Sequence, residues 1–180
     1  MAEFRVYIAV SRDGFIADAK GSVDWLEPFG SEECDYGYTN FIANISTLIM
    51  GRATFDQVLS FGQWPYADHR NIVLTHDTNA HTDIKGVTFS KAPIQDIADS
   101  LHNQDGDVWI MGGGDVTRQF MDAGLVDTME IFTMPVTLET GIALFTDDAW
   151  QGHFTMVAEN TYDDGVVHTT YQTQNAATDT

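Results

Sequence analysis

The sequence of 180 residues has a single cysteine, Cys34, and no apolar run that reaches the roughly 18 residues of a membrane span. One cysteine can form neither an intrachain disulfide nor a metal site with several cysteines. The six histidines show no paired spacing such as H-E-x-x-H, and no G-x-S-x-G motif occurs, so neither metal catalysis nor a hydrolase triad is indicated. The first residues lack the basic-then-apolar pattern of a secretory signal, and we expect a cytoplasmic protein.

Basic residues are also scarce. The chain has 8 lysines and arginines against 27 aspartates and glutamates, which gives a net charge of -19 at pH 7. Nucleic acids and anionic membranes are bound by cationic surfaces, so we expect neither as a partner. Two explanations of the acidity stay open: an ordinary solvated surface, or adaptation to high salt, in which ions screen the repulsion between like charges.

Apolar segments and turn residues alternate along the chain in a pattern typical of an α/β protein. Asp163-Asp164-Gly165 between two β-rich runs predicts a hairpin near the C-terminal end. We therefore expect a mostly parallel sheet with an antiparallel edge, in one domain over residues 1–172, followed by a disordered tail over 173–180. Strands are expected at 4–10, 47–50, 70–75, 87–89, 108–111, 128–136, 154–162 and 166–172, and residues 15–17 form a short apolar run after the first turn. Helices are expected from Ser31 through Ile45 and at 52–61, 94–101 and 116–123.

Three of the expected strands end in residues suited to a nucleotide. The first strand end is Gly51-Arg52-Ala53-Thr54, where a helix opens with an arginine; the second is the glycine run 112–114; the third is Thr75-His76. Helix N-termini and glycine backbones favour phosphate groups, and ligands of open α/β sheets bind beyond the carboxyl ends of the strands. Each motif alone also fits an ordinary strand-to-helix turn, but together they favour nucleotide binding. None is a G-x-G-x-x-G or P-loop motif.

The order of several short motifs resembles the dihydrofolate reductase superfamily, especially the branch that contains the reductase domain of riboflavin biosynthesis, the RibD C-terminal domain. The matching pieces are Ser11-x-Asp13-Gly14-x-Ile16-Ala17, Trp25-Leu26, Met50-Gly51-Arg52-x-Thr54-Phe55, Asn71-Ile72-Val73-Leu74-Thr75, the glycines 112–114, Gly124-Leu125-Val126-Asp127, Pro135-Val136 and Gly141-Ile142-x-Leu144-Phe145. They extend over residues 4 to 172. The resemblance implies a three-layer dihydrofolate-reductase-like fold.

The resemblance also implies roles for individual residues. Cofactor contacts with NADPH are implied for Ala9, Ile16, Gly51, Arg52, Thr54, Thr75, His76, Gly113, Gly114, Asp115, Val116 and Thr117. Ala9 and Ile16 would lie beside the nicotinamide, whereas Thr75 and His76 would lie beside the adenine ribose. Trp25 and Phe55 would contact the substrate. Asp35 and Thr133 are the implied catalytic residues, and Asp35 would bind a planar N–C–N edge; a surface acid at a helix start is its alternative role.

Some residues depart from the family pattern. His69 stands where an arginine grips the glutamate tail of folate, and Glu139 stands where a glycine is usual. We expect an NADPH-dependent reductase that transfers hydride to a pyrimidine- or pterin-like heterocycle, a small-molecule substrate. A nucleotide-binding protein without catalysis is the alternative. NADH in place of NADPH, and a homodimer in place of a monomer, stay open.

Overall fold

A computed structural model describes residues 1–30, 34–77 and 79–174. The chain forms two compact units. The first unit contains residues 1–6 and 45–126, and the second contains residues 7–44 and 127–180. Strand β1 (Phe4–Val10) begins in the first unit and ends in the second. One domain over residues 1–172 stays a prediction.

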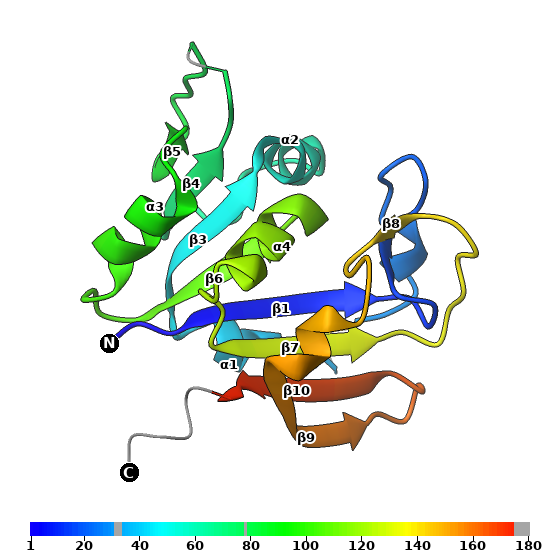
Figure 1. The fold of residues 1–180 in the computed structure, drawn as a ribbon. Helices are drawn as coiled ribbons and strands as arrows, with labels where there is room; N and C mark the ends of the chain where they lie inside the picture. The colour runs from blue at the N-terminus through cyan, green and yellow to red at the C-terminus, as the bar shows by residue number, and fades with distance from the viewer. Residues whose placement is uncertain (31–33, 78, 175–180) are drawn as a thin grey trace. The chain divides into compact units, whose positions relative to one another are not determined.

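The first unit is built on parallel strands. Its strands β3 (Ile45–Gly51), β4 (Arg70–Leu74), β5 (Val87–Ser90) and β6 (Asp107–Gly112) lie in the order β5-β4-β3-β6, with the start of β1 beside β6. Helices α2 (Arg52–Ser60), α3 (Ile94–Leu101) and α4 (Gly114–Asp122) connect or follow these strands (Figure 1). Leu48, Ile49 and Met50 of β3 are fully buried, as expected for a strand covered on both faces.

The second unit contains the antiparallel strands. The end of β1 is followed by β7 (Thr128–Thr133), β10 (Val167–Thr173) and β9 (Phe154–Thr161) in that order, and β10 is antiparallel to both of its neighbours. Strands β2 (Phe15–Ala17) and β8 (Ile142–Ala143) form a separate pair. The short helices are α1 (Tyr38–Ile42) and the 3-10 helices Asp24–Leu26 and Ala149–Gly152. The predicted hairpin between β9 and β10 is confirmed.

The region around α1 differs from the sequence prediction. Ile45, expected in a helix, begins β3 and pairs with Asp107 of β6. The helix cannot extend backwards from Tyr38, because Tyr36 and Gly37 have φ values of 52° and 86°, outside the helical range. The predicted helix start at Ser31 lies outside the described residues.

Two further strand boundaries also differ from the prediction. Strand β7 ends at Thr133 rather than at residue 136, since Pro135 has no N–H to donate. Thr173, expected in the tail, is the last residue of β10, and residues 175–180 lie outside the described part. Within the described ranges, no helix has the length and apolar character needed to cross a membrane.

Candidate functional site

The three strand ends chosen from the sequence lie at one edge of the first unit. Strands β4, β3 and β6 are parallel neighbours, and their registers pair Gly51 with Leu74 and Met50 with Gly112. Thr75, Arg52 and Gly113 therefore all follow the carboxyl ends of adjacent strands. Figure 1 shows α2 starting at the tip of β3 in the same unit. This is the edge at which ligands of open α/β sheets bind.

Because Gly51 and Gly113 have no side chain, the starts of α2 and α4 can approach each other. A β-carbon added to Gly51 would lie 3.2 Å from Val116 Cγ2, and one added to Gly113 would lie 3.4 Å from Thr54 Oγ1. Gly112 has a φ of 110°, a conformation that side chains rarely permit, and the peptide bond between Gly112 and Gly113 is cis. The starts of α2 and α4 therefore lie close together, and we term the region between them the cradle.

The two helix starts carry partial positive charge toward this cradle. Gly51 and Gly113 are the N-cap residues of α2 and α4, and neither helix has a side-chain cap. The first N–H groups of a helix have no partner within it, and the helix dipole adds about half a positive charge at that end. An anionic group such as a diphosphate fits here.

Thr117 supplies a buried polar group in the first turns of α4. Its side chain is 0% exposed, and its hydroxyl has no hydrogen-bond partner among the described residues. A β-carbon added to Gly112 would lie 3.7 Å from that oxygen. Burying a hydroxyl without a partner is unfavourable unless a ligand or water satisfies it. Val116 and Gly114 are also buried, whereas Asp115 is exposed and forms an ion pair with Arg118.

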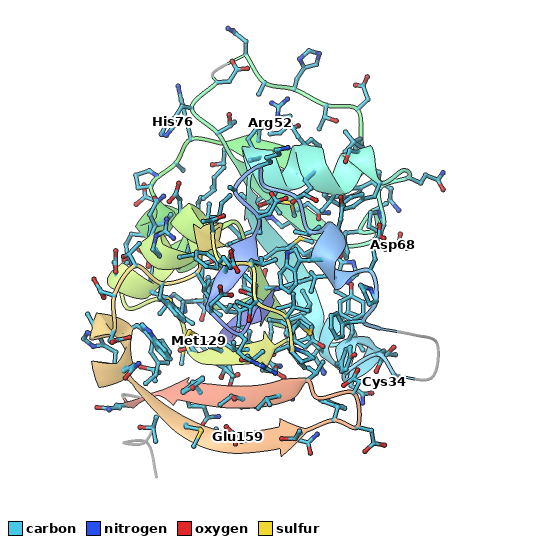
Figure 2. All side chains as sticks on the ribbon, turned by 90° about the vertical axis from the view of Figure 1, so that its right-hand side faces the viewer. Cys34, Arg52, Asp68, His76, Met129 and Glu159 are labelled. Atoms are coloured by element: carbon cyan, nitrogen blue, oxygen red, sulfur yellow. The ribbon has the colours of Figure 1, made fainter. Side chains whose placement is uncertain are left out.

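Arg52 is held in a defined position at the start of α2. Its Nε donates to both carboxylate oxygens of Asp56, at 2.8 and 3.0 Å, and its guanidinium lies 5.1 Å from the centre of the Phe89 ring. The Nη groups are the donors that could meet a phosphate. Figure 2 shows Arg52 and His76 at the same end of the first unit. The hydroxyl of Thr75 accepts a hydrogen bond from Asp77 N at 3.1 Å, so it shapes the turn after β4.

Phe55 lies in the interior of the first unit. Its side chain is 3% exposed, and its ring centre lies 5.0 Å from that of Trp64 and 5.4 Å from that of Phe89. The structure therefore places Phe55 in the hydrophobic core, where its packing stabilises α2 against β5. Its contact with a substrate stays a prediction.

Asp35 lies in the second unit, just before α1. Its carboxylate accepts hydrogen bonds from the backbone N–H groups of Gly37 and Thr39, both at 2.9 Å. The Thr39 hydroxyl and these N–H groups lower the pKa of Asp35 below its usual range. Asp35 is therefore ionised at neutral pH, where it can accept a hydrogen bond or balance a positive charge but is not a proton donor.

Trp25 and Ala9 pack against the same hydrophobic cluster of the second unit, formed by Phe132, Met134 and Val166. Aromatic side chains dominate the surroundings of this cluster, which we term the aromatic cluster. The residues packed against it are Tyr7, Ala9, Trp25, Leu26, Phe29, Tyr36 and Tyr162. The Trp25 Nε1 atom is buried and has no hydrogen-bond partner in the described part of the chain.

The tyrosines of the aromatic cluster are held in the neutral form. Burial raises the pKa of Tyr7, and burial together with a hydrogen bond to Asp164 raises the pKa of Tyr36 to about 12. The Tyr7 hydroxyl donates to the Tyr36 carbonyl oxygen at 3.1 Å. The remaining predicted residues of this unit, Ile16 in β2 and Thr133 at the end of β7, are half-buried.

Asp13 holds a loop together and was not singled out from the sequence as a site residue. Its carboxylate accepts hydrogen bonds from the Ser11 hydroxyl at 2.6 Å and from the N–H groups of Leu138 and Glu139 at 3.1 and 2.8 Å. Glu139 takes a φ of 66°. Glu139 therefore adopts the left-handed backbone conformation that a glycine, the residue usual at this position in the family, adopts without strain. The Ser-x-Asp-Gly motif is the sequence signal for Asp13, but two of its partners, Leu138 and Glu139, lie more than a hundred residues away.

Among the described residues, no group of three or more His, Cys, Asp or Glu side chains is arranged to hold a metal ion. The sequence does match a known family, because the model of the RibD C-terminal domain matches residues 4–168. The chain belongs to the RibD C-terminal domain family. This confirms the resemblance seen in its motifs.

Two relatives in Bacillus subtilis strain 168 share this similarity. The uncharacterized protein YwjB is 37% identical over 142 residues, which cover 78% of this chain and 80% of YwjB. The uncharacterized protein YyaP is 29% identical over 177 residues, which cover 91% of each chain.

Solved structures confirm the fold. A protein of Shewanella sp. PV-4, described as a candidate riboflavin biosynthesis protein, has a TM-score of 0.84 and 31% identity, covering 97% of this chain and 99% of that one. Dihydrofolate reductase from Enterococcus faecalis, solved with NADP(H), has a TM-score of 0.70 and 20% identity, covering 96% of both chains. The deaminase and 5-amino-6-(5-phosphoribosylamino)uracil reductase of Thermotoga maritima has a TM-score of 0.73 and 18% identity, covering 96% of this chain and 56% of that one. The fold is dihydrofolate-reductase-like.

Proposed function

We propose that this protein is an NADPH-dependent reductase that transfers hydride to a carbon–nitrogen double bond, or a related carbonyl, in a pyrimidine- or pterin-like heterocycle. The observation that carries the proposal is the cradle between the starts of α2 and α4, with the partnerless Thr117 hydroxyl buried beside it. Membership of the RibD C-terminal domain family and the likeness to an NADP(H)-bound dihydrofolate reductase support it.

The residues at the cradle fit a dinucleotide. Gly51 and Gly113 allow the starts of α2 and α4 to lie close together, so a diphosphate could meet two sets of backbone N–H groups at once. Val116 and Thr117 bound the cradle on the α4 side, and the Thr117 hydroxyl would gain the partner that it lacks. The remaining predicted contacts are Thr54 and Gly114 at the helix starts and Asp115 on the exposed side of α4.

The adenosine end of the cofactor would lie by Arg52, Thr75 and His76. Arg52 is fixed by Asp56 and Phe89 before any ligand arrives, which lowers the entropy lost when it binds a phosphate. A 2′-phosphate would make use of this cation, so we propose NADPH rather than NADH. His76 is exposed and could add a hydrogen bond to the same phosphate.

When bound, the cofactor supplies hydride to a carbon atom of the heterocycle, and a proton is added to the neighbouring nitrogen or oxygen. Two side chains assigned to the substrate, Trp25 and Asp35, belong to the second unit and would bind and orient it. Asp35, ionised at neutral pH, would accept N–H groups of a planar ring, and Trp25 would supply an apolar surface. Because Asp35 holds no proton at neutral pH, the proton must reach the substrate from solvent, and Asp35 would stabilise the protonated ring.

The alternative is a protein that binds a nucleotide without catalysis. It is favoured by one observation: both oxygens of Asp35 already accept backbone hydrogen bonds from the start of α1. In that case Asp35 serves only to stabilise the helix start, and no acid remains for the substrate among the predicted residues.

The experiment combines NADPH binding with NADPH oxidation. We expect the protein to bind NADPH, to oxidise it only when a suitable heterocycle is added, and to lose affinity for NADPH on Thr117→Val, which removes the hydroxyl but keeps the shape. Thr47→Val is the matched control, since Thr47 is also buried but its hydroxyl already bonds Gln104 at 3.0 Å. Binding without oxidation across a panel of pterins and pyrimidines supports the alternative, and absence of NADPH binding refutes the proposed reductase.

A further inference from the structure

The two units share the charge of the chain unequally. The second unit contains only two basic residues, Arg12 and Lys20, against sixteen acidic ones. The first unit holds the remaining six basic and eleven acidic residues. The surplus of negative charge is therefore fourteen in the second unit and five in the first. Trp25 and Asp35, which are proposed to bind the substrate, lie in the second unit.

Four of the eight basic residues form ion pairs with carboxylates of the described part of the chain. The ion pairs are Arg5 with Asp107 at 3.3 Å, Arg52 with Asp56 at 2.8 Å, Lys85 with Asp68 at 3.2 Å, and Arg118 with Asp115. Arg70 lines a shallow depression of about 240 Å³ between β4, β5 and α3, which also contains Asp96. Arg12 and Lys20 are exposed on either side of β2, in turns that also contain Asp13 and Asp18.

Negative charge lies close to the aromatic cluster. Asp164 accepts a hydrogen bond from the Tyr36 hydroxyl, and Glu130 forms a 3.1 Å contact with His168, whose ring stacks on Phe132. Asp35 directly precedes Tyr36 in the chain. A phosphate or carboxylate near these residues would meet like charges, whereas ring N–H groups would meet acceptors.

We infer that the substrate is a neutral or cationic planar heterocycle that carries no phosphate and no carboxylate tail. The inference rests on the proposed reductase function and adds the charge class of its substrate. The inference excludes two substrates: the phosphoribosyl-pyrimidine in the name of the Thermotoga maritima enzyme, and dihydrofolate, which carries a glutamate tail. Aromatic rings recognise a planar heterocycle by stacking, and that interaction needs no cation.

Two matched pairs of compounds test this inference on the full-length protein. One pair is 5-amino-6-(ribosylamino)uracil with and without its 5′-phosphate. The other is a dihydropterin with and without the aminobenzoyl-glutamate tail. Equilibrium binding is followed by tryptophan fluorescence in the presence of NADP⁺, so the result does not depend on turnover, and NADPH oxidation is measured separately.

We expect the member without the anionic group to bind more tightly in each pair, on the order of tenfold at low salt. The difference should shrink in about 1 M KCl, where the Debye length falls to roughly 3 Å. Equal or tighter binding of the anionic members at low salt overturns the inference, as does a failure of all four compounds to bind. Binding of the tail-free compounds without NADPH oxidation supports the charge class and instead contradicts the reductase function.

A charge-reversal variant makes the test independent of compound shape. Glu27→Lys changes an exposed acid of the second unit, two residues from Trp25, and Asp105→Lys makes the same charge change on an exposed acid of the first unit. We expect Glu27→Lys to improve binding of the phosphorylated compound about threefold or more, with less change for its neutral partner. An equal response to both substitutions would count against an electrostatic origin of the selectivity.

Discussion

The β-carbon that Gly113 lacks would lie 3.4 Å from the hydroxyl oxygen of Thr54. The two residues are almost sixty positions apart in the chain, yet the end of β6 and the first turn of α2 lie next to each other at this point. A side chain at residue 113 would therefore occupy the space between the two helix starts. This relationship ties two of the motifs found in the sequence to one small region of the first unit.

Gly113→Val should abolish most NADPH binding while leaving the fold intact. An added β-carbon is tolerable at 3.4 Å, but the two further methyl groups of valine would fill the cradle. We expect a loss of affinity of at least about 1.4 kcal/mol, or tenfold, measured by calorimetric titration. Gly152→Val is the control, because a β-carbon at Gly152 meets no atom within 4 Å and lies in the second unit. Unchanged affinity in a folded Gly113→Val protein would remove the cofactor from this cradle.

Asp35→Asn should reduce turnover far more than NADPH affinity. Asparagine keeps one side-chain oxygen, so it can accept only one of the N–H groups of Gly37 and Thr39, and it lacks the charge that would hold a ring N–H or a protonated ring. We expect kcat/KM for the heterocycle to fall on the order of tenfold or more. Equal turnover of the two proteins would leave Asp35 with a structural role only.

The pH profile gives a second readout for Asp35. Its folded-state pKa is depressed, so its carboxylate charge is fully present at neutral pH and is lost only on acidification below its ordinary pKa of about 3.9. Between pH 5 and 8, roughly the range in which histidine titrates, Asp35 should produce no acid limb in kcat/KM. An acid limb in this range that disappears in Asp35→Asn would contradict this assignment.

Glu139→Gly should stabilise the protein. Glu139 has a φ of 66°, a conformation that costs a non-glycine residue about 1–2 kcal/mol, of which the greater freedom of glycine in the unfolded chain offsets part. We expect a net gain of about 0.5–1 kcal/mol, seen as a higher melting temperature. Thr140→Gly is the control and should destabilise, because Thr140 is not among the residues with positive φ. A lower melting temperature for Glu139→Gly would show that the turn is not strained.

The sequence was sufficient to predict elements whose signals are local. Residues 4–10 form a strand and Ile94–Leu101 a helix behind Pro93, as predicted, because apolar runs and a proline at a helix start act over a few residues. Ile45 was assigned wrongly, since its helical spacing from Phe41 is overridden by pairing with β6. Strand β8 was not predicted, because its two residues are strand only through their pairing with β2.

In the candidate site, too, the sequence predicts the local features but not the contacts between distant segments. The glycine turns could be found from the sequence, but their proximity could not, because it depends on β6 lying beside β3. The buried state of Phe55 depends on Trp64 and Phe89, and the role of Asp13 depends on Leu138 and Glu139. These contacts arise only when distant segments meet, so no local pattern reports them.

Salt should stabilise the protein and strengthen cofactor binding. With 27 acidic and 8 basic residues, like charges repel within the folded state and also repel an anionic dinucleotide. Raising KCl from about 0.1 M to 1 M shortens the Debye length from roughly 10 Å to 3 Å, so both the melting temperature and the NADPH affinity should rise. Sucrose is the control, since it favours burial without screening charge. If sucrose stabilises as well as KCl does, or molar KCl has no effect, the acidity is an ordinary solvated surface.

The most direct test of the central claim is a titration with NADPH of the native protein, Arg52→Ala and Lys85→Ala. Both substitutions remove one cation that is paired with an aspartate of the first unit, but only Arg52 lies at the start of α2. We predict that the native protein binds NADPH and that Arg52→Ala weakens this binding by about 1.5–3 kcal/mol, the scale of a charged hydrogen bond. NADH should be affected less, and Lys85→Ala should behave like the native protein. A native protein that does not bind NADPH, or an equal response to the two substitutions, would contradict the account.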